Sequence, residues 1–195
     1  MPAIWFIVYH PFAGVARSYG IEFGVRREQR MTLQNQGLNF NLPENRPGQK
    51  ALRKGRVSLP NQVYLITTTT LNRQRFFDNC NAGYAAARCF ESTAILGDAT
   101  MLAWVLMPDH AHWLISLGQR DSLSIVVNRL KSSSSRLANR ALDRCGQLWS
   151  PGYHDHALRT EDDLIETARY IVANPLRAGL VKRVGDDPFW NAIWV

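Results

Sequence analysis

Apolar residues in the middle of the chain form short, nearly continuous runs of the kind found in buried strands. Val63 to Thr70 consists of β-branched and aromatic residues with one leucine, a composition that favours a strand. Two further apolar runs, Ala99–Met107 and His110–Leu117, are separated by Pro108 and Asp109, residues typical of turns. We therefore expect three strands, the last two joined as a hairpin.

Other segments carry apolar residues at helical spacing. The segments Asn81–Leu96 and Ser122–Asp143 are both expected to be helices. In the second, the apolar positions are Leu123, Val126, Val127, Leu130, Leu137 and Leu142. A third helix is expected after Thr160, a capping residue followed by three acidic residues. It should stop at Asn174, because Pro175 disfavours helical geometry at the residue before it.

The order of these elements favours an antiparallel sheet. With a short extended piece at His154–Leu158, the order is strand, helix, strand, strand, helix, strand, helix. Strands and helices do not alternate strictly, which argues against a parallel doubly wound sheet. We predict an α+β fold, a ferredoxin-like antiparallel sheet with helices on one face.

The first quarter of the chain has a different pattern. Residues 1–58 lack a clear period, and residues 35–47 are rich in Asn, Gly and Pro. We predict a basic N-terminal extension over residues 1–52, either disordered or an ordered arm, and one folded domain over residues 53–195.

Charge sharpens this division. The chain of 195 residues has a net charge of +7, and residues 1–60 hold 9 basic and 3 acidic residues. Basic proteins of this kind suit a polyanionic partner. No run of 18 apolar residues occurs, so no membrane span is expected. Three cysteines without a pairing pattern favour a reducing cytoplasm.

Two histidine pairs are candidates for metal ligands. His110 and His112 flank Ala111 on a predicted strand, so both imidazoles face the same side and can share one divalent ion. His154 and His156 have the same spacing around Asp155. Either pair could bind a metal, all four could form a zinc site, or the histidines could serve only as half-buried or hydrogen-bonding side chains.

Two predicted helices carry further candidates. Tyr170 and Asn174 lie four residues apart, so they share a helix face, and they offer a nucleophile and an oxygen ligand. The helix Ser122–Asp143 carries a hydroxyl-rich basic stretch suited to phosphate oxygens. Its cations are Arg129, Lys131, Arg136 and Arg140.

Three blocks of sequence together resemble the REP-associated tyrosine transposases, chromosomal relatives of the single-tyrosine HUH transposases of bacterial insertion sequences. The blocks are LAWVLMPDHAHWLI (residues 102–115), LWSPGYHDHALRTEDDL (148–164) and YIVANPLRAGLV (170–181). The resemblance implies that His110 and His112 bind Mg²⁺ or Mn²⁺, that Tyr170 is the nucleophile and that Asn174 is the third ligand. It assigns no certain role to His156. It does not extend to residues 1–50.

The resemblance also implies a substrate and a reaction. The substrate would be single-stranded DNA folded into REP-like hairpins, cleaved and rejoined through a 5′-phosphotyrosine. From their charge, we expect Arg159 and the four cations of the basic helix to contact phosphates, with His156 as a further candidate. A monomer is expected, although insertion-sequence relatives act as dimers, and the expected location is the bacterial cytoplasm, at the nucleoid. The alternative is a domesticated hairpin-binding protein with little catalysis.

Overall fold

The described residues form a sheet of five strands, in the order β4-β1-β3-β2-β5, and every neighbouring pair is antiparallel. The computed structural model describes residues 58–158 and 161–194, without the side chains of residues 161–163. These residues belong to one compact unit, residues 48–195. The predicted extension over residues 1–52 and Arg159 lie outside the described residues. The strands are β1 (Val63–Thr69), β2 (Thr100–Met107), β3 (His110–Ser116), β4 (His154–Leu158) and β5 (Trp190–Ala192).

The strand predictions are confirmed to within a residue or two. The turn at Pro108 and Asp109 joins β2 to β3 as a hairpin, and Met107 pairs with His110. Strand β5, only three residues long, was not predicted. It adds to the outer edge of β2, where Trp104 pairs with Asn191.

Five helices accompany the described strands. They are α1 (Cys80–Ala87), α2 (Thr93–Leu96), α3 (Leu123–Ala141), α4 (Glu161–Val172) and α5 (Asn174–Arg177), with short 3₁₀ turns at Leu71–Arg73, Phe76–Asp78 and Val184–Asp186. The single helix predicted over residues 81–96 is wrong. The chain leaves the helix after Ala87 and turns, so that Phe90 inserts its ring 5.3 Å from that of Trp104 and 5.2 Å from that of Trp113.

The third predicted helix also differs at its end. Helix α4 stops at Val172, and Asn174 begins α5 rather than ending a helix. Pro175 causes the interruption because it has no N–H to donate. Backbone hydrogen bonds from Ala173 to Arg169 and from Arg177 to Ala173 keep the two helices nearly continuous.

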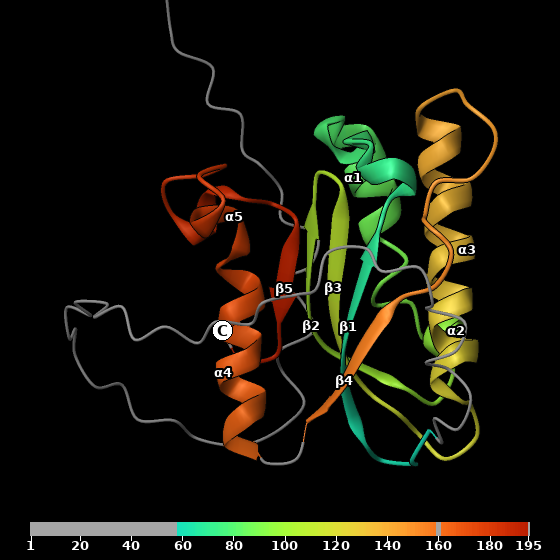
Figure 1. The fold of residues 1–195 in the computed structure, drawn as a ribbon, viewed down its shortest axis with the longest axis vertical. Coiled ribbons are helices and arrows are strands. Elements are labelled where there is room, and N and C mark those ends of the chain that lie inside the picture. The colour runs from blue at the N-terminus through green and yellow to red at the C-terminus, as the bar shows by residue number, and fades with distance from the viewer. Residues whose placement is uncertain (1–57, 159–160, 195) are drawn as a thin grey trace, which may run out of the picture. The chain divides into compact units, whose positions relative to one another are not determined.

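Helices cover both faces of the sheet, so the prediction of helices on one face is wrong (Figure 1). Helices α1, α2 and α3 pack on one face, against Trp104, Leu106 and Trp113 among others. Helix α4 packs on the other, against Val105 and Met107. The central strands β2 and β3 are buried on both sides, and an apolar face left bare would be costly.

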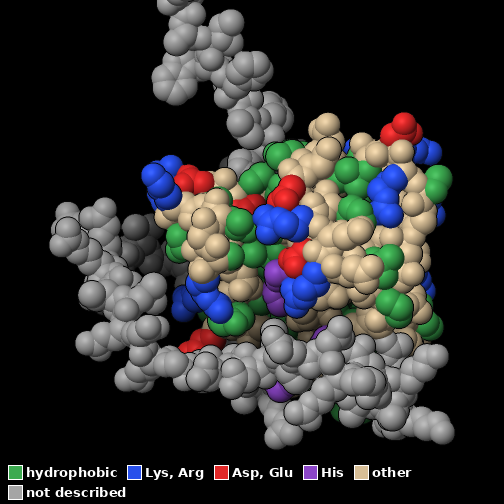
Figure 2. Space-filling view, turned by 45° about the horizontal axis from the view of Figure 1, so that its top comes forward, with side chains coloured by type: hydrophobic (Ala, Val, Ile, Leu, Met, Phe, Trp, Pro, Cys, Tyr) green, Lys and Arg blue, Asp and Glu red, His purple; other side chains and the backbone are tan. Residues whose placement is uncertain are grey.

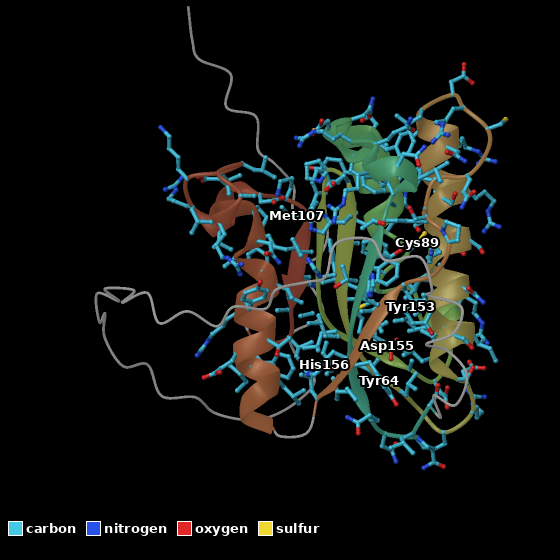
Figure 3. All side chains as sticks on the ribbon, in the orientation of Figure 1. Tyr64, Cys89, Met107, Tyr153, Asp155 and His156 are labelled. Atoms are coloured by element: carbon cyan, nitrogen blue, oxygen red, sulfur yellow. The ribbon has the colours of Figure 1, made fainter. Side chains whose placement is uncertain are left out.

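The two faces are called here the core face, covered by α1–α3, and the α4 face. Figure 3 shows their separation: Cys89 lies on the side of α3, whereas Met107 and His156 lie on the side of α4. None of the helices in the described part of the chain is both long enough and apolar enough to cross a bilayer.

Candidate active site

The histidine pair of the hairpin lies on the α4 face. His110 and His112 pair with Met107 and Val105 of β2, and directly opposed residues project from the same face of a sheet. Met107 and Val105 belong to the cluster packed against α4. The two imidazole centroids are 5.0 Å apart, with the rings nearly perpendicular. The spacing therefore brings the two rings together, as predicted.

Each ring is held through its Nδ1 atom. The Nδ1 of His112 lies 2.9 Å from the hydroxyl of Thr67, its partner on β1, and the Nδ1 of His110 lies 2.6 Å from the carboxylate of Asp109. Arg73 donates to the other oxygen of that carboxylate at 3.1 Å. Among the described residues no hydrogen bond engages either Nε2. Fixing one ring nitrogen in this way orients the other, which is how metal-binding histidines are usually supported.

Electrostatics keep His112 neutral. Burial, followed by the neighbouring His110 and the positive charge of Arg177, lowers the pKa of His112 to about 3. A neutral imidazole has the lone pair that a metal requires. Burial of the Asp109 carboxyl opposes its ionisation, but the hydrogen bonds and charges of His110 and Arg73 outweigh this, so the pKa of Asp109 lies below its ordinary value.

Tyr170 lies on α4 and packs against the apolar cluster that contains Val105 and Met107. These are the residues paired with the two histidines, so the tyrosine and the imidazoles border one apolar cluster. The phenol oxygen accepts a 2.8 Å hydrogen bond from Arg177, whose guanidinium carbon lies 3.9 Å from the ring centroid. The positive charge of this guanidinium also contributes to the lowered pKa of His112.

Asn174 is the remaining predicted ligand. It follows Tyr170 by four residues across the short break between α4 and α5. Its amide nitrogen is buried and has no hydrogen-bond partner among the described residues. The nitrogen therefore loses no hydrogen bond to the described residues if the amide turns its oxygen toward a ligand.

The second histidine pair stays apart from the first. His154 and His156 are on the edge strand β4, and β1 lies between β4 and β3, so that Thr67 separates His154 from His112. No group of three or more His, Cys, Asp or Glu side chains that could hold a metal occurs in the described ranges. The structure therefore does not bring the four histidines together as the alternative zinc site would require, because β1 lies between the two pairs.

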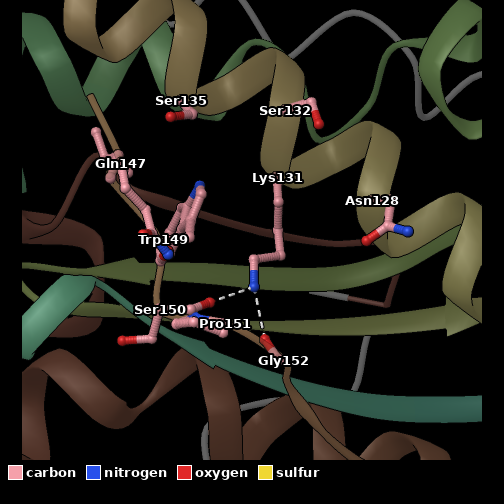
Figure 4. A pocket seen from close by; sticks show the side chains of 10 residues that line it. Asn128, Lys131, Ser132, Ser135, Gln147, Trp149, Ser150, Pro151 and Gly152 are labelled. Carbon is pink, nitrogen blue, oxygen red and sulfur yellow. Dashed lines mark hydrogen bonds between the residues drawn. The ribbon is translucent and has the colours of Figure 1, made fainter. Parts of the chain in front are cut away.

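The four cations of the basic stretch are on α3, which covers the core face, so the structure does not bring them to the histidines. Arg129 forms an ion pair with Asp121, at 2.7 Å. Lys131 donates to the carbonyls of Ser150 and Gly152 at 2.7 and 2.5 Å, beside an open hollow of about 300 Å³ (Figure 4). Arg136 and Arg140 are exposed.

Histidine side chains are visible on the surface of the molecule. In Figure 2 they lie between basic and acidic side chains.

Three residues of the site were not singled out from the sequence. Thr67 becomes a partner of His112 only through the register of β1 and β3, which no local pattern reveals. The sequence around Asp109 predicts only a turn. Arg177 follows Tyr170 by seven residues, two helical turns, and that spacing could have placed it on the same face.

Comparison with known proteins finds relatives among the transposases. A REP-associated tyrosine transposase of Escherichia coli (strain K12) is 32% identical over 89 residues, 45% of this chain and 50% of that protein. A relative from Haemophilus influenzae is 30% identical over 98 residues, 45% of this chain and 56% of that protein. The chain thus covers about half the length of these relatives.

A solved structure of a REP-associated tyrosine transposase bound to a REP hairpin has a similar fold. The TM-score is 0.54 at 23% identity, over 69% of this chain and 79% of that chain. At this identity the likeness shows the fold alone. The family model described as "Transposase IS200 like" matches residues 58–174, more than half of the sequence. The chain therefore belongs to the family of IS200-like transposases.

Proposed function

We propose that this protein is a metal-dependent tyrosine transposase that cleaves and rejoins single-stranded DNA through a covalent bond to Tyr170. The observation that carries the proposal is the pair of buried or half-buried imidazoles, each held through Nδ1, beside the apolar cluster against which Tyr170 packs. Membership of the IS200-like family supports it. The strand order β4-β1-β3-β2 supports a ferredoxin-like arrangement of the domain.

The residues on the α4 face fit a divalent cation such as Mg²⁺ or Mn²⁺. His110 and His112 would hold it through Nε2, and Asn174 through its amide oxygen, since that amide has no hydrogen-bond partner for its nitrogen among the described residues. When bound, the ion would polarise the scissile phosphate and stabilise charge on its oxygens.

The protein's own groups account for the bond chemistry. The phenol oxygen of Tyr170 attacks phosphorus and forms an O–P bond, releasing its proton to water. The bond from phosphorus to the 3′ oxygen breaks, its electron pair stays on that oxygen, and the oxygen takes up a proton as a 3′-OH. The product is a 5′-phosphotyrosine, which a 3′-OH can attack to rejoin strands without a nucleotide cofactor.

The proposed partner is single-stranded DNA that folds into REP-like hairpins. The solved relative with the similar fold is bound to a REP hairpin, and the curated relatives are REP-associated transposases. We propose that four side chains contact phosphates of the DNA: Arg136, Arg140, Arg159 and His156. Arg129 and Lys131 would join them by giving up the hydrogen bonds that they form within the protein. We expect a monomer working at the bacterial nucleoid.

The test uses the full chain, Mn²⁺ and single-stranded hairpin oligonucleotides labelled at the 3′ end, the end that stays attached to the tyrosine. We expect a covalent adduct on a denaturing gel that disappears in Tyr170→Phe. An adduct of full yield in that variant would refute the nucleophile assignment. Hairpin binding without any adduct would favour the alternative, a domesticated hairpin-binding protein.

A further inference from the structure

Arg177 contacts the nucleophile at the atom that would react. Its Nη2 donates a 2.8 Å hydrogen bond to the phenol oxygen of Tyr170, while the guanidinium carbon lies 3.9 Å from the ring centroid. A guanidinium is planar and presents five N–H donors. One edge of the cation can therefore hold the phenol oxygen while its other donors remain available to a second group.

The backbone places Arg177 there. Tyr170 and Arg177 are seven residues apart, and backbone bonds on both sides of Ala173 carry the helical path across the break. Side chains two turns apart lie on one face of a helix. Pro175 fixes the start of α5, with its ring buried, so the element that carries Arg177 is anchored.

No acidic side chain of the described residues forms an ion pair with Arg177, whereas Arg73 pairs with Asp109 and Arg129 with Asp121. The cation lies against the phenol of Tyr170, with its own side chain exposed to incoming groups. A bound anion would therefore pair with the positive charge of Arg177.

We propose that Arg177 is a catalytic residue that binds the scissile phosphate at the oxygen of Tyr170. The inference rests on the proposed function, because it requires Tyr170 to be the nucleophile. In the free protein the guanidinium holds the phenol oxygen. As the O–P bond forms and the bond to the 3′ oxygen breaks, the same donors contact the non-bridging oxygens of the phosphate that is now attached to Tyr170. The proton of Tyr170 leaves to water, and the 3′ oxygen departs as a hydroxyl.

A purely structural role makes a different prediction. If Arg177 only packed on the ring to hold Tyr170, any long side chain would serve and no particular charge would be needed. If it contacts phosphate in the transition state, cleavage depends on the cation, whereas hairpin binding, spread over many phosphates, depends on it little.

The experiment measures the rate of adduct formation and the affinity for the same 3′-labelled hairpin oligonucleotides in Mn²⁺. The variants are Arg177→Gln, Arg177→Lys and Arg177→Ala, the last also with millimolar guanidinium or an equal concentration of sodium chloride. Arg183→Gln is the matched control, since Arg183 is an exposed arginine whose ion pair with Asp186 lies at 2.8 Å. Thermal unfolding checks that each variant is folded.

We expect Arg177→Gln to slow adduct formation about 100-fold, as loss of one donor to a developing charge does, with hairpin affinity changed less than about threefold. Arg177→Lys should retain an intermediate rate, and guanidinium should partly restore Arg177→Ala. Arg183→Gln should behave as the parent.

An unchanged rate in Arg177→Gln would overturn the inference alone, provided that the adduct still depends on Tyr170. Equal losses of binding and rate, or no rescue by either lysine or guanidinium, would also overturn it. Absence of any Tyr170-dependent adduct in the parent would instead overturn the proposed function, and with it this inference.

Discussion

The core face and the α4 face are built from alternate residues of the same strands, yet they differ in chemistry. His112 and Trp113 are neighbours on β3, and both are almost fully buried. Trp113 meets the rings of Phe90 and Trp149 on the core face, whereas His112 meets the hydroxyl of Thr67 on the α4 face. Burial therefore has two uses in this domain. On the core face it stabilises the domain, and on the α4 face it keeps an imidazole neutral and oriented.

The largest expected effect comes from the core face. Trp113→Ala should lower the free energy of unfolding by about 3–5 kcal/mol, because it leaves a cavity between two aromatic rings. Chemical denaturation at low temperature measures this. Trp113→Phe, which keeps a ring, should cost much less. If the alanine variant were as stable as the parent, the core face would not be the main source of stability.

The second largest effect is expected on the rate of adduct formation, from the two histidines of β3. His112→Ala, and separately His110→Ala, should slow adduct formation by about 100- to 1,000-fold, since each removes a group needed to stabilise charge on the phosphate. Hairpin affinity should stay close to that of the parent. Parallel gel-shift and adduct assays separate the two quantities. Normal cleavage in either variant would show that the histidines have no metal role.

A smaller effect is expected from the residue that holds His110. Asp109→Ala removes the carboxylate at 2.6 Å from Nδ1 and should weaken the apparent affinity for Mn²⁺ by about 10- to 100-fold. Titration of cleavage with Mn²⁺ measures the shift, and saturating metal should restore most of the rate. Asp78→Ala, which removes an exposed carboxylate paired with Arg75, is the control. A reduced rate that no metal concentration restores would contradict this role.

The smallest effect is expected on α3, over the core face. Arg136→Gln with Arg140→Gln should weaken hairpin binding only a few-fold and reduce the slope of log affinity against log salt by about 0.7 for each phosphate that is no longer neutralised. Cleavage of bound DNA should not change. Arg75→Gln serves as a control for loss of one exposed arginine. An unchanged salt slope would remove these two arginines from the DNA interface, and a lower rate on bound DNA would link α3 to the chemistry.

The sequence was informative where the pattern is local. The β-branched run of β1, the apolar runs of β2 and β3, and the spacing of Leu123, Val126 and Leu130 on α3 each predict the element observed. The same-face relation of His110 and His112 follows from the two-residue period of a strand. These features need no knowledge of the rest of the chain.

The sequence was uninformative where the outcome depends on distant partners. The break after Ala87 is set by the slot between Trp104 and Trp113 that Phe90 fills, and an alanine-rich segment gives no sign of it. Three residues of β5 form a strand only because β2 offers a free edge. The face chosen by α4 depends on the two-sided burial of the central strands. The contact of Thr67 with His112 depends on register.

The alternation of β3 has a further consequence for how the protein can vary. Successive residues from His110 to Ile115 point to opposite faces, so a shift of the strand by one position would turn both histidines into the core and expose Trp113 to α4. Site and core would fail together. Away from the two histidines and Trp113, single substitutions in this strand keep the alternation, whereas gain or loss of one residue shifts every position beyond it. Among functional members of the lineage, we expect β3 and the turn before it to keep a constant length while positions other than Asp109, His110, His112 and Trp113 vary.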